Sequence, residues 1–123
     1  MDTYDIPVAD LLLDVSNPRH DPVETQEEQI AALVKDDQIK SLATDIAMNG
    51  LSPIEKPIVM YDEGSEKYIV LEGNRRVCSL ILLQNPMLAP ASLRSAFNNM
   101  SKDKVPDSIE CALAESREQA RLW

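Results

Sequence analysis

The chain has 123 residues, 44% of them hydrophobic and 27% charged, and 21 acids against 12 bases give it a formal net charge of −9. This length and composition indicate one soluble globular domain with a single core. No apolar run approaches the roughly 20 residues of a membrane-spanning helix, and the N-terminus lacks a basic region followed by an apolar one, so we expect a cytoplasmic protein.

The first half of the chain predicts a short extended segment, a loop and two helices. Residues 4–13 are extended and 14–22 form a loop with two prolines. Thr25 and Glu28 have the spacing of a capping box, which predicts that a helix begins there. Gly50 is expected to end the second helix in a left-handed conformation. The apolar face of that helix is Ile39, Leu42, Ala43, Ile46 and Ala47, with Asp36 or Asp37 as its cap.

The second half begins with a predicted hairpin, whose strands are residues 58–61 and 68–71. A helix follows Gly73 and ends at Asn85-Pro86, because proline cannot continue it. Further along we expect a short helix after Pro90, a strand over 108–113 and a final helix capped by Ser116. The expected core residues are Leu42, Ile46, Ile69, Leu71, Leu80 and Ile81.

The cysteines and the single histidine offer little chemistry. Cys78 and Cys111 lie far apart in sequence without ligands at zinc-binding spacing, so we expect two reduced thiols, Cys78 on a helix and Cys111 in a strand. Cys78 is interpreted as a buried small hydrophobe. His20 lies in a loop, where an exposed structural role is favoured over catalysis.

The most informative segment is the junction at residues 72–76, Glu-Gly-Asn-Arg-Arg, where an apolar strand runs into a helical pattern. A glycine permits a tight turn, and the first amides of a helix have no intrahelical partner. With Arg75 and Arg76 beside them, these amides would form a cradle for phosphate. The alternative is a tight turn with two solvated arginines, because short Gly/Arg patterns often arise without function.

Several motifs in order resemble the ParB/sulfiredoxin superfamily, specifically the ParB-like N-terminal domain, also called the ParB-like nuclease domain. They are the N-P-R loop at 17–19, the L-A-x-x-I-x-x-x-G-L helix at 42–51, a Pro-Ile pair at 53–54 or 57–58, and the strand, G-x-R-R and helix after it. Residues 105–106 and the strand after them resemble the family's V-P-V-x-V segment. The resemblance covers nearly the whole chain except residues 86–103, which we interpret as an insertion.

This resemblance implies an α/β (α+β) fold, a small mixed sheet with helices packed around it, and a nucleotide pocket at the G-x-R-R turn. Gly73, Arg75 and Arg76 match the phosphate-binding turn, which also contains Asn74, and Arg19 matches the arginine of the N-terminal loop. The ligand would be ATP or CTP with Mg²⁺. DNA would be bound only through regions outside this chain, because the acidic excess disfavours direct phosphate contacts.

Two departures from the family affect the chemistry. Asn74 stands where sulfiredoxin has its catalytic cysteine, so sulfiredoxin activity is not expected. Asp45 stands where both families more often have Ser or Thr, and a carboxylate there would repel a triphosphate unless a cation lay between them. We therefore consider Glu72 and Asp45 as catalytic residues and Glu72, Asp45 and Asn74 as Mg²⁺ ligands. The alternative is that Asp45 is solvated and Glu72 pairs with Arg75 or Arg76.

Three functions remain open from the sequence. The first is a nucleotide-binding switch domain, with slow Mg²⁺-dependent nucleoside triphosphate hydrolysis, in a larger DNA-associated protein. The second is a metal-dependent nuclease or phosphotransferase, and the third is a protein-interaction module that has lost the ligand. We interpret residues 1–123 as one domain cut from a longer protein, and a homodimer is considered.

Overall fold

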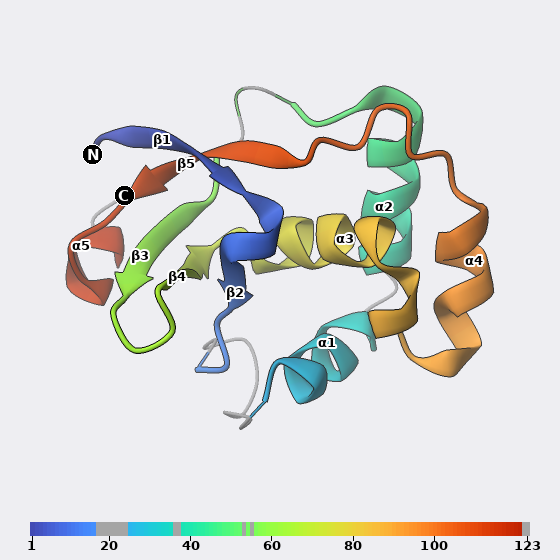
Figure 1. Cartoon of the computed structure of the whole chain (residues 1–123), viewed down its shortest axis with the longest axis horizontal. Helices are drawn as coiled ribbons and strands as arrows, with labels where there is room; N and C mark the ends of the chain where they lie inside the picture. Colours follow the sequence, from blue (N-terminus) through green and yellow to red (C-terminus); the bar gives the residue numbers. More distant parts are fainter. Residues whose placement is uncertain (17–24, 36–37, 53, 55, 122–123) are drawn as a thin grey trace.

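The structure, a computed structural model, describes residues 1–16, 25–35, 38–52, 54 and 56–121. Within these residues the chain builds a mixed sheet in the order β1-β5-β3-β4-β2, with helices around it (Figure 1). This arrangement confirms the predicted α/β (α+β) fold class. The strands are β1 (Thr3–Pro7), β2 (Leu11–Leu13), β3 (Ile58–Asp62), β4 (Lys67–Glu72) and β5 (Ser108–Leu113).

The strand pairing brings two distant segments to one edge of the sheet. β3 and β4 form the predicted antiparallel hairpin, and β1 pairs antiparallel with β5. β2 pairs parallel with β4, with Leu13 opposite Val70, and β3 pairs parallel with β5. Because the carboxyl ends of parallel neighbours meet at one edge, the residues that follow β2 and β4 emerge side by side.

The helix α3 (Asn74–Gln84) lies at the centre of the molecule and runs from the sheet towards α4 (Figure 1). Around it pack α1 (Gln26–Val34) and α2 (Gln38–Asn49), while α5 (Arg117–Arg121) lies against β4. The short elements η1 (Val8–Asp10), η2 (Pro86–Leu88) and η3 (Ala91–Leu93) and the helix α4 (Arg94–Asn99) complete the described structure.

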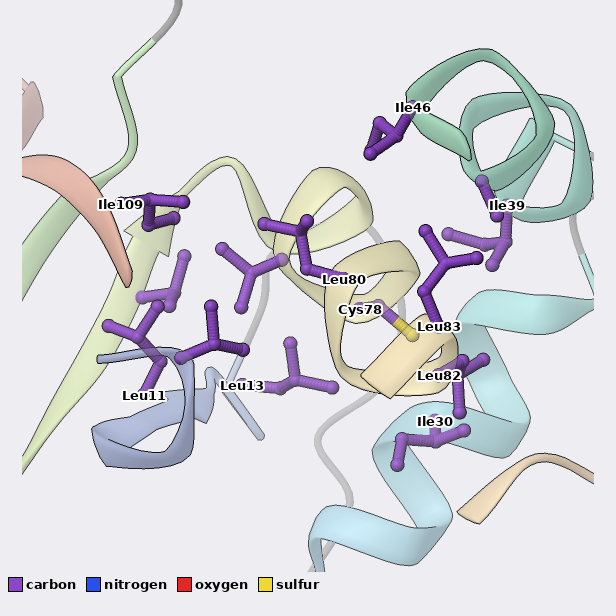
Figure 2. Close-up of a cluster of buried hydrophobic side chains, with 14 of the residues drawn as sticks. Leu11, Leu13, Ile30, Ile39, Ile46, Cys78, Leu80, Leu82, Leu83 and Ile109 are labelled. Carbon is purple, nitrogen blue, oxygen red and sulfur yellow. The ribbon is translucent and has the colours of Figure 1, made fainter. Parts of the chain in front are cut away.

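The core surrounds α3, which is apolar over most of its circumference. Figure 2 shows its leucines and Cys78 among side chains from β2, α1, α2 and β5. A helix that is hydrophobic nearly all round must be covered on several sides, which explains why three helices and the sheet all pack against it. Its fully buried residues are Val77, Cys78, Ser79, Leu80, Leu82 and Leu83.

Three helix ends that the sequence predicted are present in the structure. Thr25 caps α1, and its hydroxyl accepts a hydrogen bond from the Glu28 amide at 3.1 Å. Gly50 has a left-handed φ of 78° and ends α2. Ser116 accepts from the Gln119 amide at 3.1 Å at the start of α5. The predicted caps Asp36 and Asp37 lie outside the described residues.

The core prediction was right for Ile46 and Leu80, which are buried, and partly right for Ile81, which is half-buried against the core. It was wrong for Leu42, Ile69 and Leu71. Residues alternate between the two faces of a strand, and in β4 it is Val70 that faces the interior, so Ile69 and Leu71 lie on the half-covered opposite face. Leu42 is also only partly buried, and Ile81 is partly exposed because it lines a hollow beside α3.

The segment interpreted as an insertion, residues 86–103, forms η2, η3 and α4 beyond the end of α3. Its Phe97 is fully buried and anchors it to the core. Among the residues with a described placement, no helix is long and apolar enough to cross a membrane.

Candidate functional site

The turn between β4 and α3 has the backbone geometry that the sequence predicted. Gly73 precedes α3 with φ 99° and ψ 19°, a left-handed conformation that favours glycine. A Cβ at this position would also lie 3.3 Å from the Cβ of Pro57. The first intrahelical hydrogen bond runs from the Val77 amide to the Gly73 carbonyl at 3.0 Å. The amides of residues 74–76 precede it, so their N–H groups form the positive end of the helix.

Asn74, the first residue of α3, is 6% exposed and uses both ends of its side-chain amide within the protein. Its Oδ1 accepts from the Asp14 amide and its Nδ2 donates to the Val70 carbonyl, each at 2.8 Å. The side chain therefore joins the ends of β2 and β4. These contacts give Asn74 a structural role at the turn.

Asp14 and Arg117 form an ion pair next to this turn that the sequence analysis missed. Asp14 follows β2 and is 2% exposed. Its carboxylate accepts from Arg117 Nη1 at 2.8 Å and from Nη2 at 3.0 Å, which is a two-pronged contact. The hydrogen bond to Asp14 raises the pKa of Arg117. One signal was present in the sequence, because Arg117 lies in the first turn of α5, where a positive charge opposes the helix dipole.

Arg75 and Arg76 are the second and third residues of α3 and are both half-buried. Arg75 Nη1 donates to Oε1 of Gln38, the first residue of α2, so its guanidinium group lies between the N-terminal ends of the two helices. The predicted phosphate residues Gly73, Asn74, Arg75 and Arg76 are thus consecutive at one helix start. Arg19 and His20 lie outside the described residues.

The carboxylates considered for catalysis are both exposed. Glu72 ends β4 directly before Gly73. Asp45 lies on the outer face of α2, where Asn49 Nδ2 donates to its Oδ1 at 2.8 Å. Over the described ranges, no group of three or more His, Cys, Asp and Glu residues could hold a metal ion.

The two cysteines are free and buried, as the sequence suggested. Burial raises the pKa of the Cys78 thiol to about 12. Burial, followed by the charges of Asp5 and Glu110, raises the pKa of Cys111 to about 12 as well. Both side chains are thus protonated at neutral pH and have the character of small core residues.

A large hollow lies away from the turn. It has a volume of about 800 Å³ and is lined mainly by apolar residues of η1, α1, the C-terminal end of α3 and η2. Met87 and Leu88, 69% and 47% exposed, are part of its lining. We call this hollow the insertion groove, because residues of the 86–103 segment form one side of it.

Comparisons with known proteins relate the fold of this chain to that of a solved structure. A solved structure with TM-score 0.54 and 11% identity is the C-terminally truncated chromosome-partitioning protein ParB from Caulobacter crescentus, complexed with CTP-γ-S. The match covers 94% of this chain and 46% of that one, so this chain spans less than half of the ParB chain. No protein-family model matches the sequence, and no curated protein matches it. At this identity the match establishes the ParB-like fold.

Proposed function

We propose that this chain is a nucleotide-binding domain, in which the turn Gly73–Arg76 binds the phosphates of a nucleoside triphosphate. The observation that carries the proposal is the left-handed glycine at the start of α3, followed by two arginines. Amides at a helix start and guanidinium groups together favour an anion. The chain is otherwise acidic, with a net charge of −9, so a cluster of arginines here is poorly explained by solubility.

The ParB-like fold supports the choice of a nucleotide over a simple anion, since the ParB structure that this chain resembles was solved with CTP-γ-S. CTP is therefore the first ligand to test, and ATP the second. Arg19 belongs to the proposal on its N-P-R motif alone. In its more specific form, the proposal is that the domain slowly hydrolyses the nucleoside triphosphate and thereby acts as a switch in a larger DNA-associated protein.

Magnesium would enter with the triphosphate, since Mg²⁺ is usually held by one or two carboxylates together with substrate phosphates. Of the three ligands considered from the sequence, Glu72 is the best placed, because it is exposed and adjoins Gly73. Asn74 uses its amide internally, and Asp45 lies on the outer face of α2. We assign no catalytic step to the metal.

Isothermal titration of the chain with CTP, ATP, GTP and ADP, each with and without Mg²⁺, tests the proposal. We expect saturable binding of at least one triphosphate with a stoichiometry of one. Cytidine, which lacks the phosphates of CTP, should bind more weakly than CTP, because the proposed contacts of the protein are to phosphate. Absence of binding for all four nucleotides would contradict the proposal.

The insertion groove supports a second candidate function, a protein-interaction module. Exposed apolar residues beside a hollow are typical of surfaces that bind an apolar segment of a partner. In this candidate the domain has lost its ligand, so wild type should bind no nucleotide, and Leu88→Glu should abolish capture of such a partner. Equal capture by the variant would contradict this candidate.

A further inference from the structure

Hydrogen bonds connect α5 to the start of α3 through one buried residue, Asp14, which uses its carboxylate on one side and its backbone N–H on the other. Arg117 binds both oxygens of Asp14, and the Asp14 backbone N–H donates to the Asn74 side chain at 2.8 Å. The Ser16 amide also donates to Asp14 Oδ1 at 3.0 Å. Residues 103 positions apart are thereby joined at the edge of the sheet where β2 and β4 both end.

This ion pair differs from the other long-range pair among the described residues, Lys56 with Glu110. That pair is a single contact of 3.1 Å between side chains that are 36% and 50% exposed, so water can replace it at little cost. Asp14 is 2% exposed, and without Arg117 its carboxylate would be buried and uncompensated. The segment after β2 would have to move to rehydrate it, and the bond from Asp14 to Asn74 would be strained or lost.

The charge of Asp14 also matters for an anion at the turn. The backbone N–H of Asp14 contacts the side chain of the first residue of α3, so Asp14 adjoins the proposed phosphate site. An unpaired negative charge there would repel phosphate, and the effect would be large because the carboxylate is buried. Arg117 neutralises this charge and holds the Asp14 side chain, while the backbone N–H of the same residue binds the Asn74 side chain.

We propose that Asp14 and Arg117 are positioning residues of the anion site. Arg117 neutralises the Asp14 carboxylate and holds the end of β2 against Asn74, which orients the first amides of α3. This inference rests on the proposed function, because it concerns the affinity of the Gly73–Arg76 turn for phosphate. It adds α5, through the bonds from Arg117 to Asp14, to the elements that determine that affinity.

The test compares Arg117→Gln with wild type in titrations with CTP and Mg²⁺. We expect at least a tenfold loss of affinity. Lys56→Gln is the matched control, since it breaks a long-range ion pair of similar chemistry on the surface, and it should stay within twofold of wild type. Phe97→Leu is a folding control, because it perturbs the core at the far end of α3 and should not change affinity.

Two further measurements separate positioning from general loss of stability. The double variant Asp14→Asn with Arg117→Gln removes the unpaired charge and should recover part of the affinity lost in Arg117→Gln. Amide hydrogen exchange without nucleotide should accelerate at residues 74–77 in Arg117→Gln, more than in β1 and β5.

The possible outcomes distinguish this inference from the proposed function. If wild type binds and Arg117→Gln binds equally well, positioning is wrong and the nucleotide site stands. If Phe97→Leu is destabilised as much as Arg117→Gln and also loses as much affinity for CTP, the loss reflects general stability and positioning is wrong. If wild type binds no nucleotide at all, the proposed function fails and this inference fails with it.

Discussion

Gly73 and Pro57 face each other across the turn before α3, so that a side chain added at Gly73 would lie 3.3 Å from the Pro57 Cβ and 3.4 Å from its Cα. This contact is tighter than most Cβ contacts, and it adds to the left-handed φ of 99°. The turn therefore requires glycine for two independent reasons, even in the absence of a ligand.

We predict that Gly73→Ala lowers the free energy of unfolding by at least about 1–2 kcal/mol, the usual cost of a left-handed conformation for a residue with a Cβ. Gly64→Ala is the control, because Gly64 has no left-handed φ and its nearest contact would be Asp62 Oδ2 at 3.9 Å. Urea unfolding of both variants measures the difference. Equal stability of the two variants would show that the turn tolerates a side chain.

Leu80 on α3 is fully buried, and we predict that Leu80→Ala costs about 2–5 kcal/mol, the range for a leucine whose removal leaves a cavity. Ile69→Ala is the comparison, because Ile69 is only partly buried on the opposite face of β4. It should cost clearly less in the same denaturation experiment. A larger loss for Ile69 would mean that the covered face of β4 is assigned wrongly.

Arg76→Ala should weaken nucleotide binding by about tenfold to a hundredfold, because charge-assisted hydrogen bonds contribute roughly 1.5–3 kcal/mol each. Arg94→Ala removes the same charge in the insertion, where Arg94 Nε donates to the Ala89 carbonyl. It should leave the affinity within about twofold, a difference of under roughly 0.5 kcal/mol. Calorimetry measures the nucleotide affinity of both variants. An equal loss of affinity in the two would indicate nonspecific attraction by net charge.

The raised pKa values of Cys78 and Cys111 predict that the stability of the protein depends on pH. Their pKa values rise from 9.0 in the unfolded reference to about 12 in the folded protein. Below pH 9 the thiols are protonated in both states and their burial is not opposed by charge. As pH rises from 9 towards 12, the unfolded state releases protons first, so stability should fall.

Thermal unfolding of wild type and of the variant in which both cysteines are alanine should show this fall to be steeper for wild type above pH 9. At pH 8 a thiol reagent should react slowly with the folded protein and rapidly in denaturant, since only the thiolate is reactive. Rapid reaction of Cys78 in the folded state would contradict its assignment as an inert core residue.

Local chemistry allowed the sequence to predict most of the elements and the turn at the candidate site. The Thr25 cap, the left-handed Gly50, the hairpin and the strand-to-helix junction at Gly73 depend on residues within a few positions of each other. Such signals are readable without tertiary structure, because turn and cap geometry is dictated by neighbouring backbone and side-chain atoms.

Only the tertiary structure decided which residues support the turn. Which face of β4 is covered depends on how the sheet packs against α3. As a result Val70 is buried, whereas Ile69 and Leu71 are not. Asp14 and Arg117 meet because β2 pairs parallel with β4 and α5 lies against β4. No periodicity links residues 103 positions apart, since only the packing of the whole chain offsets the entropy of closing so long a loop.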